Sequence, residues 1–241
     1  MKNLNTFIFS LAVTIILLTS INSPAQEVKG NGNVVKETRT VPAFDKIEVN
    51  GVMNVFLNQS SAESIVVEAD KNLQPYIETK VQDNKLIIGT KEDVEIEEST
   101  KLNVYVNLKN LTKLEMNGVG NVESQNQLKL SNLTIENNGV GNLKLNLDCE
   151  KLKADFNSVG SVTLSGKAGN ASIDHNGVGN VKAFGLDADI LRIQNNAVGN
   201  SEVTCNNEIY IDLNGIGNVS YKGNAVVKAL NENGIGKVKK M

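Results

Sequence analysis

The stretch Asn138-Gly139-Val140-Gly141-Asn142-Leu143 decides the fold of this 241-residue chain, because close copies of it recur at nearly fixed spacing. Further copies begin at Asn117, Asn157, Asn176, Asn196, Asn214 and Asn233, with an outlying copy at Asn50. From Asn117 onward, successive copies start 21, 19, 19, 20, 18 and 19 residues apart. A period of this length is typical of a solenoid, in which each repeat is too small to bury its apolar side and stacks on its neighbours.

The residues between the copies alternate between apolar and polar. Leu133 and Ile135 precede one hexapeptide, and Leu143 and Leu145 follow it, each separated by a polar residue. This period of two indicates short strands on either side of a turn. Because each strand follows its predecessor after one circuit, successive strands should pair in parallel, and the crossover preference makes the coil right-handed. The sequence therefore predicts an all-β protein, a right-handed parallel β-helix with a less regular, strand-rich N-terminal cap.

The hexapeptide itself reads as a corner of the coil. Glycine at its second and fourth positions suits a bend that needs positive φ or a close approach between coils. The residue between the glycines is always β-branched, and we expect it to point inward as a plug: Val119, Val140, Val159, Val178, Val198, Ile216 and Ile235. The flanking asparagines can bond unpaired backbone groups and one another as stacked amide ladders.

Three segments are expected along the chain. Residues 1–25 resemble a secretory signal peptide, with Lys2 before an apolar run and Ser23-Pro24-Ala25 at the cleavage point. Residues 26–116 form the capping region with a first coil, and residues 117–241 form the regular coils. We expect the mature chain to be exported, periplasmic or extracellular, with no membrane span after cleavage, since no second long apolar segment follows.

Composition excludes several classes of partner and site. The net charge of −3 is small and the charges are interspersed, which argues against nucleic acid. Cys149 and Cys205 occupy similar places three coils apart, roughly 14 Å at one strand spacing per coil. A disulfide needs Cα atoms within about 7 Å of one another. Two buried free thiols are therefore expected.

We find no catalytic, cofactor-binding or metal-binding residues in the sequence. His175 is the single histidine, which excludes a multi-histidine zinc site, and its column of equivalent residues favours a packing position. The Gly-x-Gly units lack the third glycine of a dinucleotide loop, and asparagine stands where a calcium roll needs aspartate. Asp155, Asp174 and Asp212 recur just before the corner and could form an outward acidic row.

The motifs taken together resemble a known family. Ala43-Phe44-Asp45-Lys46-Ile47-Glu48-Val49-Asn50-Gly51, Val52 to Asn58, the strand around Leu86-Ile87-Ile88 and the serial repeats are similar to the bacterial GIN-domain family, described as putative auto-transporter adhesin head domains. The resemblance runs from about residue 43 to 235. It implies an exported right-handed β-helix and no catalytic residues.

The function expected from these features is non-enzymatic. We interpret the chain as an envelope or secreted protein that binds a protein or a glycan through one face of the solenoid. A carbohydrate-active enzyme on the same scaffold, a polysaccharide lyase or hydrolase, is the alternative, because such enzymes place carboxylates in a groove. A purely structural envelope protein is a third reading.

Overall fold

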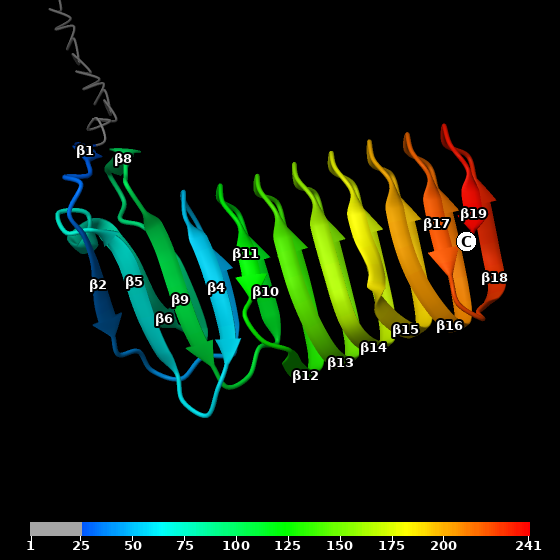
Figure 1. The fold of residues 1–241 in the computed structure, drawn as a ribbon, viewed down its shortest axis with the longest axis horizontal. Coiled ribbons are helices and arrows are strands. Elements are labelled where there is room, and N and C mark those ends of the chain that lie inside the picture. Colours follow the sequence, from blue (N-terminus) through cyan, green and yellow to red (C-terminus); the bar gives the residue numbers. More distant parts are fainter. Residues whose placement is uncertain (1–25) are drawn as a thin grey trace, which may run out of the picture.

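The computed structural model describes residues 26–241, which form one elongated stack of β-coils (Figure 1). Apart from one short 3-10 helix at Gln74–Tyr76, every regular element in this range is a strand. The predicted all-β parallel β-helix is confirmed. The proposed signal peptide, residues 1–25, lies outside the described residues. Within residues 26–241 no helix has both the length and the apolar character needed to cross a membrane.

The strands of the N-terminal part are β1 (Gln26–Lys29), β2 (Val34–Arg39), β3 (Lys46–Val49), β4 (Asn54–Gln59), β5 (Ser64–Asp70), β6 (Ile77–Gln82), β7 (Lys85–Thr90), β8 (Val94–Glu98), β9 (Leu102–Leu108) and β10 (Lys113–Met116). Those of the regular coils are β11 (Val122–Ser124), β12 (Leu128–Asn137), β13 (Leu143–Phe156), β14 (Val162–His175), β15 (Val181–Asn195), β16 (Ser201–Leu213), β17 (Val219–Lys222), β18 (Val226–Glu232) and β19 (Val238–Lys240).

Each of the four middle coils consists of one long strand, β13 to β16, that bends once and then turns at the hexapeptide. In β13 the buried and exposed residues alternate from Leu143 to Cys149, and the phase then slips, with Glu150 and Lys151 both exposed. This slip marks a bend that folds one strand across two faces of the coil. The hexapeptide closes the circuit at the opposite edge. The coil is therefore flat, with two faces and two corners.

Neighbouring coils pair in parallel along their whole length. β13 pairs with β14 from Leu143↔Val162 to Phe156↔His175, and β14 pairs with β15 in the same sense. Leucine, isoleucine and valine from both faces meet between the sheets, as Leu145, Ile173 and Ile211 do, and are almost completely buried. Because each coil buries its apolar side only against its neighbours, the core is a continuous column along the stack.

The structure of the corner differs from the expected inward orientation of its β-branched residue. The β-branched residue between the two glycines does not plug the interior, because Val119 and its equivalents are about half exposed. The alternation of the strands continues through the bend: Met116 and Val122 point inward, and Asn117, Val119 and Asn121 point outward. The inward phase therefore falls on the glycines.

The glycines at this corner have no room for a side chain. A Cβ on Gly118 would lie 2.0 Å from the carbonyl oxygen of Gly51, and a Cβ on Gly120 would lie 1.9 Å from that of Met53. Gly120 also has a φ of +138°, which L side chains rarely adopt. The neighbouring coil occupies the inside of the corner, so the apolar side chain is turned out.

Antiparallel strands close the N-terminal end of the stack. β3 and β4 are in register with β10 and β11, so they form a coil with Val52 at its corner. Beyond it, β2 and β9 pair antiparallel with β5, and β6 pairs antiparallel with β7. A hairpin at residues 82–85 joins β6 to β7, with positive φ at Asp83 and Asn84 as a two-residue turn requires. The division of the chain at residue 117 stays a prediction.

Candidate binding surfaces

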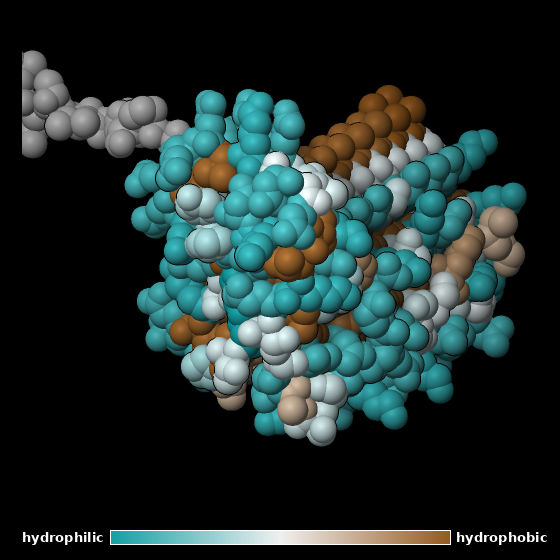
Figure 2. All heavy atoms as spheres, turned by 60° about the vertical axis from the view of Figure 1, so that its left-hand side comes forward, coloured by the Kyte–Doolittle hydropathy of each residue, from teal (hydrophilic) through white to brown (hydrophobic). Residues whose placement is uncertain are grey.

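An apolar row runs along one edge of the stack. We call it the corner ridge, and it consists of Val52, Val119, Val140, Val159, Val178, Val198, Ile216 and Ile235. Each bridges to the next through the backbone, and each is between 48 and 72 % exposed. At about 4.8 Å per coil the corner ridge is about 34 Å long. Figure 2 shows a continuous apolar row along this edge, bordered by a row of intermediate hydropathy and then by hydrophilic residues.

Two rows of amides flank the corner ridge. In the first, the side-chain N–H of each asparagine donates to the side-chain oxygen one coil nearer the N-terminus, over 2.7–3.2 Å. Asn50 is the first acceptor, and the donors are Asn117, Asn138, Asn157, Asn176, Asn196 and Asn214. In the second, side-chain oxygens accept from the backbone or amide N–H of the next coil, as between Asn121 and Asn142. The predicted asparagine ladders are confirmed.

The asparagine ladders leave some of their hydrogen-bonding groups unused. A carboxamide carries two N–H donors and an oxygen with two lone pairs, and the first ladder uses one donor and one lone pair of each inner member. In the first ladder one N–H and one lone pair of most inner residues therefore remain for a partner, while Asn196 also accepts from Gln194. In the second ladder oxygens such as that of Asn121 already accept two bonds. Both ladders are almost entirely neutral, with Lys237 as the charged exception at the C-terminal end. The edge as a whole is an uncharged strip with an apolar crest.

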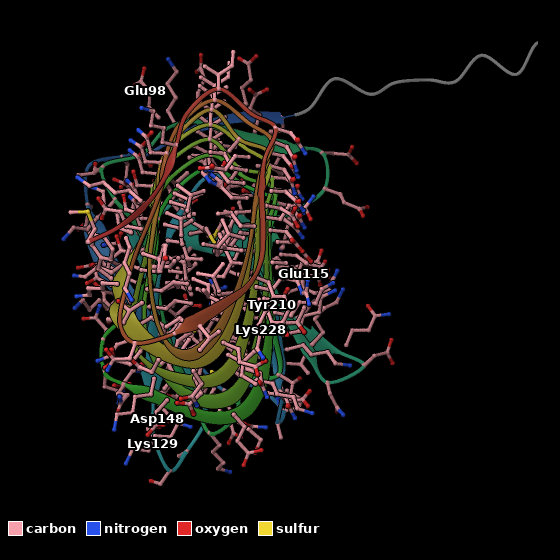
Figure 3. The ribbon with its side chains drawn as sticks, turned by 90° about the vertical axis from the view of Figure 1, so that its right-hand side faces the viewer. Glu98, Glu115, Lys129, Asp148, Tyr210 and Lys228 are labelled. Carbon is pink, nitrogen blue, oxygen red and sulfur yellow. The ribbon has the colours of Figure 1, made fainter. Side chains whose placement is uncertain are left out.

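A second surface, the charged face, carries an acidic column beside a basic one. The acidic column runs through Glu48, Glu115, Glu136, Asp155, Asp174, Gln194 and Asp212. Lysines two residues earlier in the strands neutralise much of it: Lys113 lies 2.9 Å from Glu115 and 3.1 Å from Glu136, and Lys85 pairs with Glu48. Figure 3 shows Glu115 on this face, together with Tyr210.

The predicted acidic row exists but lacks the geometry of a catalytic pair. Asp155 and Asp174 are neighbours in register, while Gln194 separates Asp174 from Asp212. Burial, together with the adjacent Asp155, raises the pKa of Asp174. Lys153 lies 3.2 Å from Asp155 and compensates its charge. These carboxylates stand along an open strand face, whereas glycoside hydrolysis needs two carboxyls on opposite sides of one bond.

A broad, open depression lies at the other edge, where the long strands bend. This bend groove has a volume of about 1160 Å³ and is lined by the in-register column Lys129, Asp148, Lys167 and Asp187, with Asn170 and Asn206 nearby. Figure 3 places Lys129 and Asp148 together at this corner. Charge alternates from coil to coil, so a lysine separates the two aspartates. We did not identify this groove from the sequence, although the spacing of 19, 19 and 20 residues in one column could have signalled it.

The chemically reactive side chains are buried. His175 lies inside the coil with Nδ1 3.3 Å from Ser201 Oγ, and burial lowers its pKa to about 4. Cys149 and Cys205 are free and buried, as expected, and burial raises the pKa of the Cys149 thiol to about 11. Among residues 26–241 there is no group of three or more histidine, cysteine or carboxylate side chains suited to a metal ion.

The comparisons with known proteins agree with this architecture. The model of the family described as "Putative auto-transporter adhesin, head GIN domain" matches residues 43–225. The chain belongs to this family. No curated protein matches the chain. The GIN-domain match covers the coil of β3 and β4 and all coils up to the start of β18.

Several solved structures share the fold of this GIN-domain protein. A putative adhesin from Bacteroides fragilis NCTC 9343 is 28 % identical with a TM-score of 0.85, covering 89 % of this chain and 100 % of its own. A putative adhesin from Parabacteroides merdae ATCC 43184 is 26 % identical with a TM-score of 0.67, covering 90 and 100 %. A putative lipid binding protein from Parabacteroides distasonis ATCC 8503, at 22 % identity, TM-score 0.71 and coverage of 90 and 100 %, shows the fold alone.

Proposed function

We propose that this GIN-domain protein is an exported, non-enzymatic envelope or secreted protein that binds a protein or glycan partner through the corner ridge and its asparagine ladders. The observation that carries the proposal is the exposure of eight aliphatic side chains in one unbroken row. Contiguous exposed apolar surface on a soluble protein marks an interaction site more often than a neutral feature. Membership of a family described as adhesins supports the same reading.

The chemistry of the strip suits a neutral partner surface. The aliphatic crest excludes water on contact, and the amides on both sides supply donors and acceptors without charge. A polar rim around an apolar centre is the usual anatomy of a protein interface. The backbone bonds that tie every corner to its neighbours keep the strip rigid, so little conformational entropy is lost on binding.

The test is a binding measurement with matched variants. The protein is purified from cells that express the full 241-residue chain, and its binding to a printed glycan array and to immobilised mucin is measured. A triple variant of the corner ridge, Val140→Ser, Val159→Ser and Val178→Ser, should lose binding by at least tenfold, about 1.4 kcal/mol. The control replaces Asp148, Lys167 and Asp187 of the bend groove by Asn, Gln and Asn.

The two variants separate the surfaces. Loss of binding in the ridge variant with retention in the groove variant supports the proposal. The reverse result moves the site to the bend groove and refutes it. Export is tested separately by N-terminal mass analysis of the protein recovered outside the cytoplasm, where cleavage before Gln26 is expected.

A further inference from the structure

A shallow pocket interrupts the basic column of the charged face. Its floor is formed by Ala171 and Ser172 of β14. At the position of Ser172 the coil before carries Lys153 and the coil after carries Arg192, so a short side chain stands between two long ones. The resulting pocket, which we call the Ser172 pocket, has a volume of about 420 Å³, within the range of about 300–1,000 Å³ found for small-molecule sites.

The charge around the Ser172 pocket is positive. Among the residues that the structure describes, three cations and no carboxylate line it, and the cations are Lys151, Lys153 and Arg192. Lys153 lies 3.2 Å from Asp155 and is compensated by it. Within residues 26–241 neither Lys151 nor Arg192 takes part in an ion pair. Two cations without an ion-pair partner therefore face one pocket of a chain with a net charge of −3, and they attract an anion.

Arg192 is held in place by an aromatic ring. Its Cζ lies 4.5 Å from the centre of the Tyr210 ring, which is a cation–π contact. The Tyr210 hydroxyl, on the charged face in Figure 3, donates to Glu208 over 3.2 Å, and Lys228 lies 3.2 Å from the same carboxylate. A guanidinium that lies over a ring keeps the N–H groups along its edge available, and their fork matches the two oxygens of a carboxylate. The pocket therefore has a donor that is prepared for an oxyanion.

The other side chains of the Ser172 pocket suit a sugar ring. Ala171 provides an apolar floor, and Ile190, which is 38 % exposed, adds an apolar wall. Asn170 and Ser172 also line the pocket, and within the described part of the chain neither side chain has a hydrogen-bond partner. A pyranose carries C–H groups on its faces and hydroxyls around its edge, so it can use the apolar surface and the free polar groups together.

The acidic column beside the pocket limits the charge of its ligand. Asp155 and Asp174 stand two residues further along the strands than Lys153 and Ser172. A phosphate monoester carries about −1.5 to −2 charges at pH 7, whereas a carboxylate carries a single charge. Repulsion by the two aspartates therefore disfavours the phosphate more strongly than the carboxylate.

We propose that the Ser172 pocket binds one carboxylated sugar residue, a uronic or sialic acid, of an acidic glycan. Arg192 receives the carboxylate in bidentate fashion. Lys151, on the coil at the other side of β14, adds attraction from the opposite rim. This site is separate from the corner ridge, and it adds recognition of a charged ligand to a protein whose ridge is uncharged.

The test is a titration followed by nitrogen-15 NMR. Protein from cells that express the full chain is titrated at low salt with a trimer of galacturonic acid and with sialyllactose. The matched control ligands are the methyl ester of the trimer, which has no charge, and galactose 6-phosphate. We expect a carboxylated ligand to bind, the methyl ester to bind at least about tenfold more weakly, and the binding to weaken as salt is added.

Matched variants locate the site. Arg192→Gln with Lys151→Gln should weaken binding by at least about tenfold. Lys167→Gln with Lys182→Gln removes the same charge from exposed positions outside the pocket and should change binding by less than about twofold. Arg192→Lys keeps the charge but lacks the fork and should weaken binding several-fold. Circular dichroism verifies that each variant is folded.

Four results would overturn the proposal. They are no binding of either carboxylated ligand, equal binding of the methyl ester, tighter binding of galactose 6-phosphate, and an equal loss in the control variant. The Ser172 pocket shares no residue with the corner ridge, so the triple ridge variant should bind the carboxylated ligand as the wild type does. Failure of this site and failure of the proposed function are therefore distinguishable.

Discussion

Replacing one corner glycine should destabilise the protein far more than replacing the valine beside it. Gly179 has a φ of +139°, and a Cβ there would lie 1.9 Å from the carbonyl oxygen of Gly160. Val178, its neighbour in the corner ridge, is half exposed. The prediction concerns Gly179→Ala and Val178→Ala, two small substitutions at adjacent positions.

The magnitudes follow from the geometry. An alanine at positive φ costs about 1–2 kcal/mol. To relieve the overlap the two coils must separate, which weakens the corner bonds from Val178 N–H to Ser158 and from Gly160 N–H to Val178, each about 1 kcal/mol. Gly179→Ala should therefore lower the free energy of unfolding by about 3–4 kcal/mol. Val178→Ala removes a half-buried side chain and should cost about 1 kcal/mol.

The assay is urea unfolding followed by far-ultraviolet circular dichroism, since the chain has no tryptophan. The two variants should have similar m values and clearly separated midpoints. If Gly179→Ala falls within about 1 kcal/mol of Val178→Ala, the close packing of coils at the corner is not a constraint on stability and the explanation for the outward valine fails.

Three further predictions concern buried polar groups. Because burial lowers the pKa of His175 to about 4, against about 6.5 when unfolded, its contribution to stability is present above pH 6.5 and is lost as the pH falls towards 4. In His175→Phe, phenylalanine replaces the histidine as it stands at Phe156 one coil away. When the pH falls from 7 to 4.5, the free energy of unfolding of this variant should decrease by about 2.5 kcal/mol less than that of the wild type. Equal decreases in urea titrations at the two pH values would contradict this. Asp70 accepts hydrogen bonds from Gly32 N–H and from the backbone and hydroxyl of Thr100, and although burial opposes its ionisation, these donors lower its pKa. Asp70→Asn should cost about 2 kcal/mol at pH 7, and an unchanged urea midpoint would show that these bonds do not anchor the cap. The Cys149 thiol, with a pKa of about 11, should react with a thiol reagent at pH 8 only as fast as the protein unfolds, and rapid labelling of the native state would place it at the surface.

The repeat made the coil predictable, and the same repeat misled us about the corner. Spacing and alternation were sufficient for parallel stacking, the asparagine ladders and the separation of the two cysteines. The valine was assigned inward because it is apolar and invariant among the copies. Its phase pointed the other way, since Asn117 and Asn121 are outward and Val119 lies midway between them. If the alternation of inward and outward positions had been continued through the glycines, it would have predicted the corner ridge.

The bend groove depends on information that one repeat does not contain. Lys129, Asp148 and Lys167 differ in sequence and come together only through the register of β12, β13 and β14. Asp187 joins them after a register shift between Thr163 and Ser165. The exposure of Val227 and Leu230 in the last coil likewise emerges only when the coils are laid in order, because both residues have the pattern of core residues. Local sequence patterns predict the individual coils, whereas grooves and exposed ends depend on how several coils are arranged.

The register shifts bear on how such a protein can change length during evolution. Coils vary from 18 to 21 residues, yet every corner bridges to the next without interruption. Bulges within β14, β15, β16 and β18, away from the corners, accommodate the extra or missing residues of these coils. Insertions can therefore accumulate beside the bend groove and reshape it while the opposite edge keeps its spacing. One molecule thus combines an edge of constant spacing with an edge that absorbs differences in coil length.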